Sequence, residues 1–254
     1  MSHPKILSLT LIAACCLGRV AAAQEFSIES KVYDGRELRS SSTTLFVEGK
    51  TYNFLGSPDE TVILAPRDGR IVLLDNGRKV RADLTTEEVV GFCEQLRVKA
   101  DRSSSEAIRF FAAPEFSEKL DPETREVVLH STWMEYRAKT TSPPSAAALK
   151  SYEEYVLWQS RLNAMTNPGS PPPAARQKLN DALSRRQMLP AEVSLRRTSL
   201  IPGFGRTLRA EHLYTWRLDD PDRRRIAQAD ERMASFKAVS ISDYLKPIVA
   251  AAKR

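Results

Sequence analysis

The sequence predicts an α+β protein in which helices pack against one side of an antiparallel sheet. Short apolar runs between Phe46 and Leu84 are separated by Glu48-Gly49, Asp68-Gly69 and Asn76-Gly77. Asp-Gly and Asn-Gly pairs favour tight hairpins because these residues accept a positive φ. Strands so close in sequence must be antiparallel, since a parallel crossover needs about a dozen residues or more. Helical periodicity in the middle of the chain supplies the second layer.

The first predicted strand, Phe26–Tyr33, alternates apolar and polar residues, which is typical of a sheet with one solvated face. The polar stretch Asp34–Ser42 is predicted as a loop or a turn. In the long strand predicted at 126–139, Met134 and Tyr136 point to one face and Trp133 to the other. Residues 46–55 are predicted to contain a turn at Glu48-Gly49-Lys50, and further strands are predicted at 61–65, 70–75, 80–84, 116–120, 193–200 and 207–218.

Thr85 precedes the first predicted helix, because its side chain and that of Glu88 can form a capping box. The apolar residues that follow share one helical face and predict a buried stripe: Val89, Phe92, Cys93 and Leu96. Further helices are predicted at 103–113, within an insertion at about 143–188, from 220 and from 242. We expect all of residues 24–254 to form a single domain.

Residues 1–23 have the pattern of an export signal. Lys5 gives a positive start, Ile6–Ala14 is an apolar core, and Ala21-Ala22-Ala23 offers a cleavage site. The core is about half of the roughly 20 residues that a membrane-spanning helix needs. The alternative is a lipobox ending at Cys15, which would leave a lipid anchor there. Both interpretations predict an exported protein, in the periplasm or at the cell surface of a bacterium.

Charge and cysteine content narrow the classes of partner. The whole chain has a formal net charge of +6, and loss of Lys5 and Arg19 leaves 36 basic against 32 acidic side chains, or +4. Because the basic residues are interleaved with acids, we predict no nucleic-acid partner. Only Cys93 remains after the signal, so an internal disulfide is excluded, and export without disulfides fits a bacterial periplasm or cell surface better than a eukaryotic secreted domain.

The sequence contains no catalytic motif, and we predict that the protein is not an enzyme and needs no cofactor. His130 and His212 are the histidines that remain after the signal, and their spacing matches no metal-ligand motif. Cys93 lies on an apolar helical stripe, which favours a core role over that of a nucleophile. The serine clusters lack the Gly-x-Ser-x-Gly context of a hydrolase.

Large apolar side chains on the predicted sheet are the remaining candidates for a site. Either they form ordinary core, or some of them line an apolar cleft for an acyl chain, since ligand sites combine apolar walls with few polar groups. The candidate cleft residues are Trp133, Met134, Tyr136, Tyr214 and Trp216.

The order of elements resembles that of the periplasmic carriers of outer-membrane lipoproteins. The resemblance lies in the short strands Thr51-Tyr52-Asn53-Phe54, Thr61–Ala65 and Arg70–Asp75 behind a signal peptide, and it covers about residues 25–85. It implies a curved antiparallel sheet, an open half-barrel, with helices packed on one side. It also implies that a lipid or a lipoprotein acyl chain binds in the half-barrel cleft. The helical insertion at about 143–188 departs from the family pattern, and the family's buried arginine has no assignable counterpart.

Two functions follow from these expectations. The first is an exported, non-enzymatic protein that binds an apolar ligand, a lipid or a lipoprotein acyl chain. The alternative is a protein-interaction or envelope-sensor module on the same scaffold, with an envelope protein as partner and no bound lipid.

Overall fold

The computed structural model describes residues 25–167, 170, 173–198 and 206–251, and the predicted signal peptide lies outside these residues. Within them, one sheet contains twelve strands in the order β12-β6-β5-β4-β3-β2-β1-β11-β10-β9-β8-β7. The first six strands are β1 Phe26–Asp34, β2 Glu37–Val47, β3 Lys50–Leu55, β4 Glu60–Ala65, β5 Arg70–Asp75 and β6 Val80–Thr85. The others are β7 Ser117–Asp121, β8 Glu126–His130, β9 Met134–Thr141, β10 Leu189–Arg197, β11 Arg206–Thr215 and β12 Lys237–Ala238.

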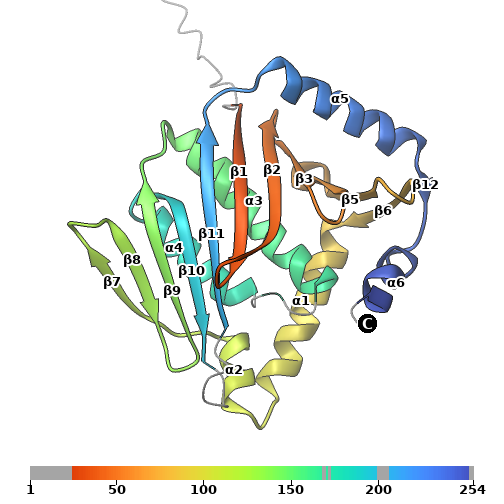
Figure 1. The fold of residues 1–254 in the computed structure, drawn as a ribbon. Coiled ribbons are helices and arrows are strands. Elements are labelled where there is room, and N and C mark those ends of the chain that lie inside the picture. Colours follow the sequence, from red (N-terminus) through yellow and green to blue (C-terminus); the bar gives the residue numbers. More distant parts are fainter. Residues whose placement is uncertain (1–24, 168–169, 171–172, 199–205, 252–254) are drawn as a thin grey trace, which may run out of the picture.

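The sheet is open and almost wholly antiparallel. Only the pairing of β12 with β6 is parallel, and β7 and β12 form the two edges of the described sheet. The amino-terminal strand β1 pairs with β11, which joins the hairpin ladder β1–β6 to the strands β7–β11. Figure 1 shows the sheet bending, with β1, β2 and β11 seen face on and β3 to β6 turned edge on. The predicted curved antiparallel sheet is confirmed.

Six helices accompany the sheet in the described residues: α1 Thr86–Asp101, α2 Glu106–Ala112, α3 Ala146–Thr166, α4 Pro173–Ser184, α5 Asp220–Ser235 and α6 Ile241–Ala251. A 3-10 turn, η1, spans Pro66–Asp68. On one sheet face, α1, α3 and α6 pack over β4 to β6, and α4 packs over β8 to β10. The other face is covered in part by α5, so helices lie on both sides of this end of the sheet.

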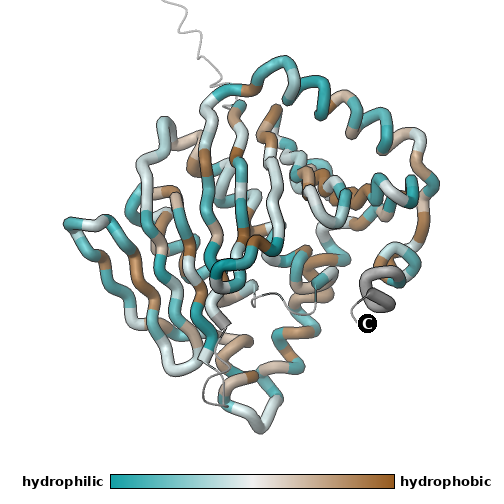
Figure 2. Tube along the Cα trace, viewed as in Figure 1, coloured by the Kyte–Doolittle hydropathy of each residue, from teal (hydrophilic) through white to brown (hydrophobic). Residues whose placement is uncertain are grey.

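This double cover explains the continuous apolar runs in β4 and β5. Ile63, Val72 and Leu74 face α5, whereas Leu64 and Leu73 face α1 and α3. Buried strands with both faces covered lose the alternation of polar and apolar residues. Figure 2 shows hydrophobic residues concentrated in this part of the sheet.

Local signals place several boundaries as the sequence predicts. The Thr85 side chain accepts a hydrogen bond from Glu88 N, and the Glu88 carboxylate accepts one from Thr85 N, which completes the capping box. Glu48 and Gly49 both have positive φ angles, 49° and 77°, as a tight hairpin turn requires. At the Asn76-Gly77 turn, the residue with positive φ is instead Lys79.

Two predictions of secondary structure are wrong, one of a loop and one of a strand. The polar stretch at 34–42 is largely strand, because β2 begins at Glu37 and pairs with β1 from Glu37 to Phe46, with one shift of register. Backbone pairing holds these exposed polar residues in the sheet without any apolar pattern. The predicted single strand at 126–139 is a hairpin, since the chain turns between β8 and β9 and Ser131 N donates to Met134 O at 3.0 Å.

Candidate functional site

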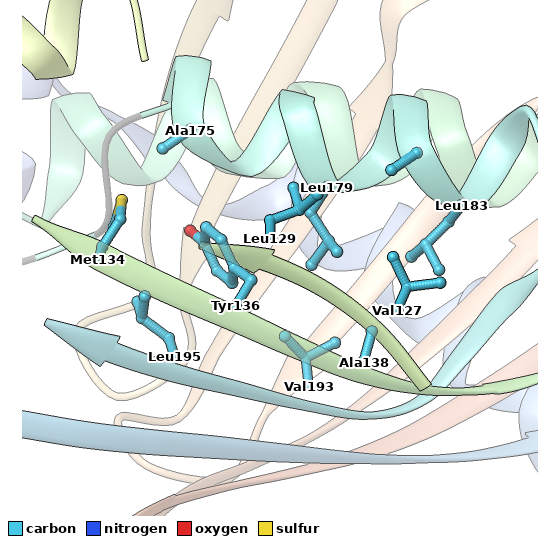
Figure 3. Close-up of a cluster of buried hydrophobic side chains, with 11 residues drawn as sticks. Val127, Leu129, Met134, Tyr136, Ala138, Ala175, Leu179, Leu183, Val193 and Leu195 are labelled. Atoms are coloured by element: carbon cyan, nitrogen blue, oxygen red, sulfur yellow. The ribbon is translucent and has the colours of Figure 1, made fainter. Parts of the chain in front are cut away.

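Two of the five residues predicted to line a cleft, Met134 and Tyr136, lie in the hydrophobic core beneath α4. Each is 1% exposed. Figure 3 shows them on β9 beneath α4, in a cluster that includes Leu179 and Leu183 of that helix. Burial raises the pKa of Tyr136 to about 12. The hairpin between β8 and β9 places these two side chains on the core face.

Tyr214 and Trp216 form a separate group beside α3. Their rings stack with centroids 5.2 Å apart and planes 13° apart. The ring centroid of Trp216 also lies 5.3 Å from that of Phe26. The Tyr214 hydroxyl donates to Pro190 O at 2.8 Å. Trp133 is half-buried in the turn between β8 and β9, where its carbonyl oxygen accepts a hydrogen bond from the backbone of Thr198. The five predicted residues therefore do not form one cluster.

Polar side chains lie between the sheet and the helices near Tyr214. Ser30 Oγ and His212 Nδ1 are 2.9 Å apart, and the Arg176 guanidinium of α4 donates to the Tyr152 hydroxyl at 3.1 Å. Burial, with the positive charge of Arg176, lowers the pKa of His212 to about 4. His212 is therefore neutral at pH 7, and the group is a hydrogen-bonded part of the interior.

A pocket of about 740 Å³ lies between α1, α2, α3 and the start of α4. Its size falls within the range of about 300–1,000 Å³ that is usual for small-molecule sites. None of the five predicted cleft residues lines it. Its apolar walls come from all four helices and include Val90, Leu96, Ala100, Ile108, Phe111, Leu157, Ala164 and Ala174.

The pocket is bordered by apolar side chains that remain in contact with solvent. Val90 is 41% exposed, Leu96 39% and Ile108 45%. Three other large exposed apolar residues, Leu38, Leu120 and Leu213, lie elsewhere in the described residues. Single exposed apolar residues are ordinary, but a contiguous group around a hollow is typical of a ligand or partner site.

The sequence contains a signal for this site, although the spacing of its residues predicts a buried core stripe. The stripe predicted on the first helix ends at Leu96, and only Val89 among its members is fully buried, at 0% exposed. Cys93 and Leu96 line the pocket instead. The stripe extends farther along α1 than the contact with α3 and the sheet can cover.

Cys93 is one of the residues that line the pocket. Its Sγ lies 3.6 Å from the backbone oxygen of Arg161, and it is half-buried. Burial raises the pKa of the thiol, so that it stays protonated at pH 7. A thiol in this state is a weak nucleophile.

A second hollow, of about 400 Å³, lies on β7, β8 and β9. Charged side chains line it and pair with one another. His130 Nδ1 lies 3.1 Å from Glu135 Oε2, and Arg137 pairs with both Glu135 and Glu126. These are solvent-exposed ion pairs of small energetic value. Two of its lining residues, Leu120 and Val128, are apolar, and the other seven are polar or charged.

Within the described residues, no group of three or more His, Cys, Asp or Glu side chains is placed to hold a metal ion. None of the described helices combines the length and the apolar character needed to cross a membrane.

No model of a known protein family matches this chain, and no curated protein matches it. The chain is similar to the crystal structure of a LolA superfamily protein from Nitrosomonas europaea, with 5% sequence identity and a TM-score of 0.31. The match covers 79% of this chain and 89% of that one.

Proposed function

We propose that this protein is a non-enzymatic binding protein that holds the acyl chain of an amphiphile in the pocket between α1, α2, α3 and α4. The observation that carries the proposal is the apolar hollow of about 740 Å³ whose border residues Val90, Leu96 and Ile108 stay exposed. An acyl chain would cover these side chains and fill the hollow.

The energetics favour such a ligand. Each methylene moved from water into an apolar site contributes about 0.8 kcal/mol. A chain that buries roughly eight methylenes therefore gains about 6 kcal/mol, from which the cost of immobilising the ligand must be subtracted. The hollow is large enough that the walls can contact a chain from several sides.

The thiol in the pocket supports binding over catalysis. Cys93 has a raised pKa, and its described hydrogen-bond partner is the carbonyl oxygen of Arg161, which cannot act as a general base. A nucleophilic cysteine needs a lowered pKa or an adjacent base. Cys93 serves here as a small wall residue.

The half-barrel cleft predicted from the sequence is the competing position for the chain. Tyr214 and Trp216 are half-buried, and a ligand could lie against these two rings. Met134 and Tyr136 would have to lose their packing against α4 to contact a ligand. For this reason we favour the helical pocket.

Export belongs to the same proposal. The predicted signal in residues 1–23, and the alternative lipid anchor at Cys15, would place the protein in the periplasm or at the cell surface. Holding an acyl chain in a protein pocket allows an amphiphile, such as a lipid or the acyl chain of a lipoprotein, to remain in an aqueous compartment.

Alkylation of Cys93 provides a direct test of occupancy. The thiol lines the pocket, so saturating dodecanoate should slow its reaction with iodoacetamide several-fold, as followed by mass spectrometry of the peptide that contains Cys93. Dodecanol should protect the thiol as well. An unchanged alkylation rate, together with no heat of binding in isothermal titration calorimetry, would reject the proposal.

A pocket-filling substitution localises the binding. Ala164→Trp places a large ring in the pocket, whereas Ala146→Trp makes the same change at an exposed position of α3 outside it. Dodecanoate affinity should fall at least tenfold in the first variant and stay close to wild type in the second. Equal affinities in both variants would place the ligand elsewhere.

The alternative function, docking of an envelope protein, uses the same exposed apolar border. It is favoured if no amphiphile binds and if Leu96→Asp abolishes recovery of one specific partner from a bacterial envelope extract while the protein stays folded. The wild type and an Ala146→Trp protein serve as the two references.

A further inference from the structure

The charged residues that line the helical pocket are mostly basic. They are Glu94, Arg97, Lys99 and Arg161, and they lie on α1 and α3. Three positive charges and one negative charge thus surround an apolar hollow. A charge beside such a hollow attracts a ligand more strongly than a charge on the open surface does, because the apolar walls exclude water.

One basic residue is neutralised within the protein. The Arg97 guanidinium donates two hydrogen bonds to the Glu94 carboxylate, at 2.6 and 2.8 Å. This contact holds the pKa of Glu94 below its usual range, so Glu94 is ionised at pH 7. The pair contributes no net charge to the pocket.

The other two basic residues have no such compensation. Among the described residues, neither Lys99 nor Arg161 forms an ion pair with a carboxylate. The Arg161 guanidinium carbon lies 5.0 Å from the centroid of the Trp158 ring, a cation–π contact that leaves its N–H groups available. Lys99 is exposed at the border of the pocket.

The start of α4 adds a smaller positive contribution. Pro173 and Ala174 in the first turn of this helix line the pocket, and that turn contains no acidic side chain. The amino-terminal end of a helix carries partial positive charge. It reinforces the two cations and does not form a site by itself.

We propose, on the basis of the acyl-chain function above, that the pocket selects single-chain amphiphiles with an anionic headgroup, which Arg161 and Lys99 hold at the pocket border. The apolar walls take the chain, and the two cations pair with a carboxylate or a phosphate. A guanidinium can bind either group through two parallel hydrogen bonds.

Four ligands with the same chain test the headgroup. Dodecanoate, dodecyl phosphate, dodecanol and dodecyltrimethylammonium are titrated into the full-length protein by calorimetry, below their micellar concentrations. The anions should bind on the order of tenfold more tightly than the alcohol, the value expected for about 1.5 kcal/mol from charge-assisted hydrogen bonds. The cation should bind most weakly. The tighter of the two anions identifies the carboxylate or the phosphate as the natural headgroup.

The double variant Lys99→Gln/Arg161→Gln should bring the affinity ratio of dodecanoate to dodecanol close to one, because the alcohol has no charge for the two cations to pair with. Lys150→Gln, at an exposed position of α3 outside the pocket, is the charge-matched control and should retain the ratio. Equal binding of anion and alcohol by the wild type would overturn the headgroup selection and leave acyl-chain binding intact. Binding of none of the four ligands would reject both proposals.

Discussion

His212 should make the stability of this protein depend on pH. In the folded protein, burial and the nearby Arg176 cation lower the pKa of His212 to about 4, against 6.5 for an unperturbed histidine. Above pH 6.5 the ring is neutral in both states. Between pH 6.5 and 4 the unfolded chain binds the proton and the folded protein does not, so the free energy of unfolding falls as the pH is lowered.

The magnitude follows from the size of the shift. A difference of 2.5 pKa units, at about 1.4 kcal/mol per unit, corresponds to about 3 kcal/mol of stability lost between pH 6.5 and 4. Many carboxylates also titrate in this interval, and therefore a variant is needed. His212→Asn keeps a hydrogen-bonding group beside Ser30 and removes the titrating ring.

Urea denaturation of the wild type and of His212→Asn at pH 7.5, 5.5 and 4.0 measures the effect. The wild type should lose about 3 kcal/mol more than the variant over this range. His130→Gln, which changes the exposed histidine on β8, should retain the wild-type loss. Parallel pH profiles for wild type and His212→Asn, or an NMR titration of the His212 ring near pH 6.5, would refute the reasoning.

Two further predictions concern the core beneath α4 and the pocket. Leu179→Ala removes a fully buried side chain between α4 and the sheet, and should lower the free energy of unfolding by about 2–5 kcal/mol in urea denaturation; a loss below 1 kcal/mol would mean that α4 does not close this core. In calorimetry of fatty acids of increasing length, each added methylene should tighten binding by up to about fourfold until the pocket is filled; an affinity independent of chain length would exclude burial of the chain.

Much of the fold could be predicted because its signals are local. The hairpin ladder was marked by turn residues and apolar runs, and the start of α1 was marked by the side chains of Thr85 and Glu88. The errors arose where pairing decided the structure. The polar strand β2 is held by its ladder with β1, and a turn at 131–133 reverses the chain where the sequence pattern continues without a break.

The candidate site was harder to predict because packing depends on the whole fold. The turn before β9 moved Met134 and Tyr136 onto the same face as Val127 and Leu129, beneath α4. Conversely, the stripe on α1 has the spacing of a core helix, but its partners cover only the half that contains Val89. Periodicity shows which residues share a face; it does not show how much of that face a neighbour covers.

The central claim is that an acyl chain occupies the helical pocket, and photo-crosslinking tests it most directly. A fatty acid with a diazirine on its chain is bound, irradiated and located by peptide mass spectrometry, with excess unlabelled dodecanoate as competitor. The pocket proposal predicts displaceable labelling on α1, α2 and α3, near Leu96, Ile108 and Leu157. Labelling that is not displaced, or that falls on Tyr214 and Trp216 of the sheet, would contradict it.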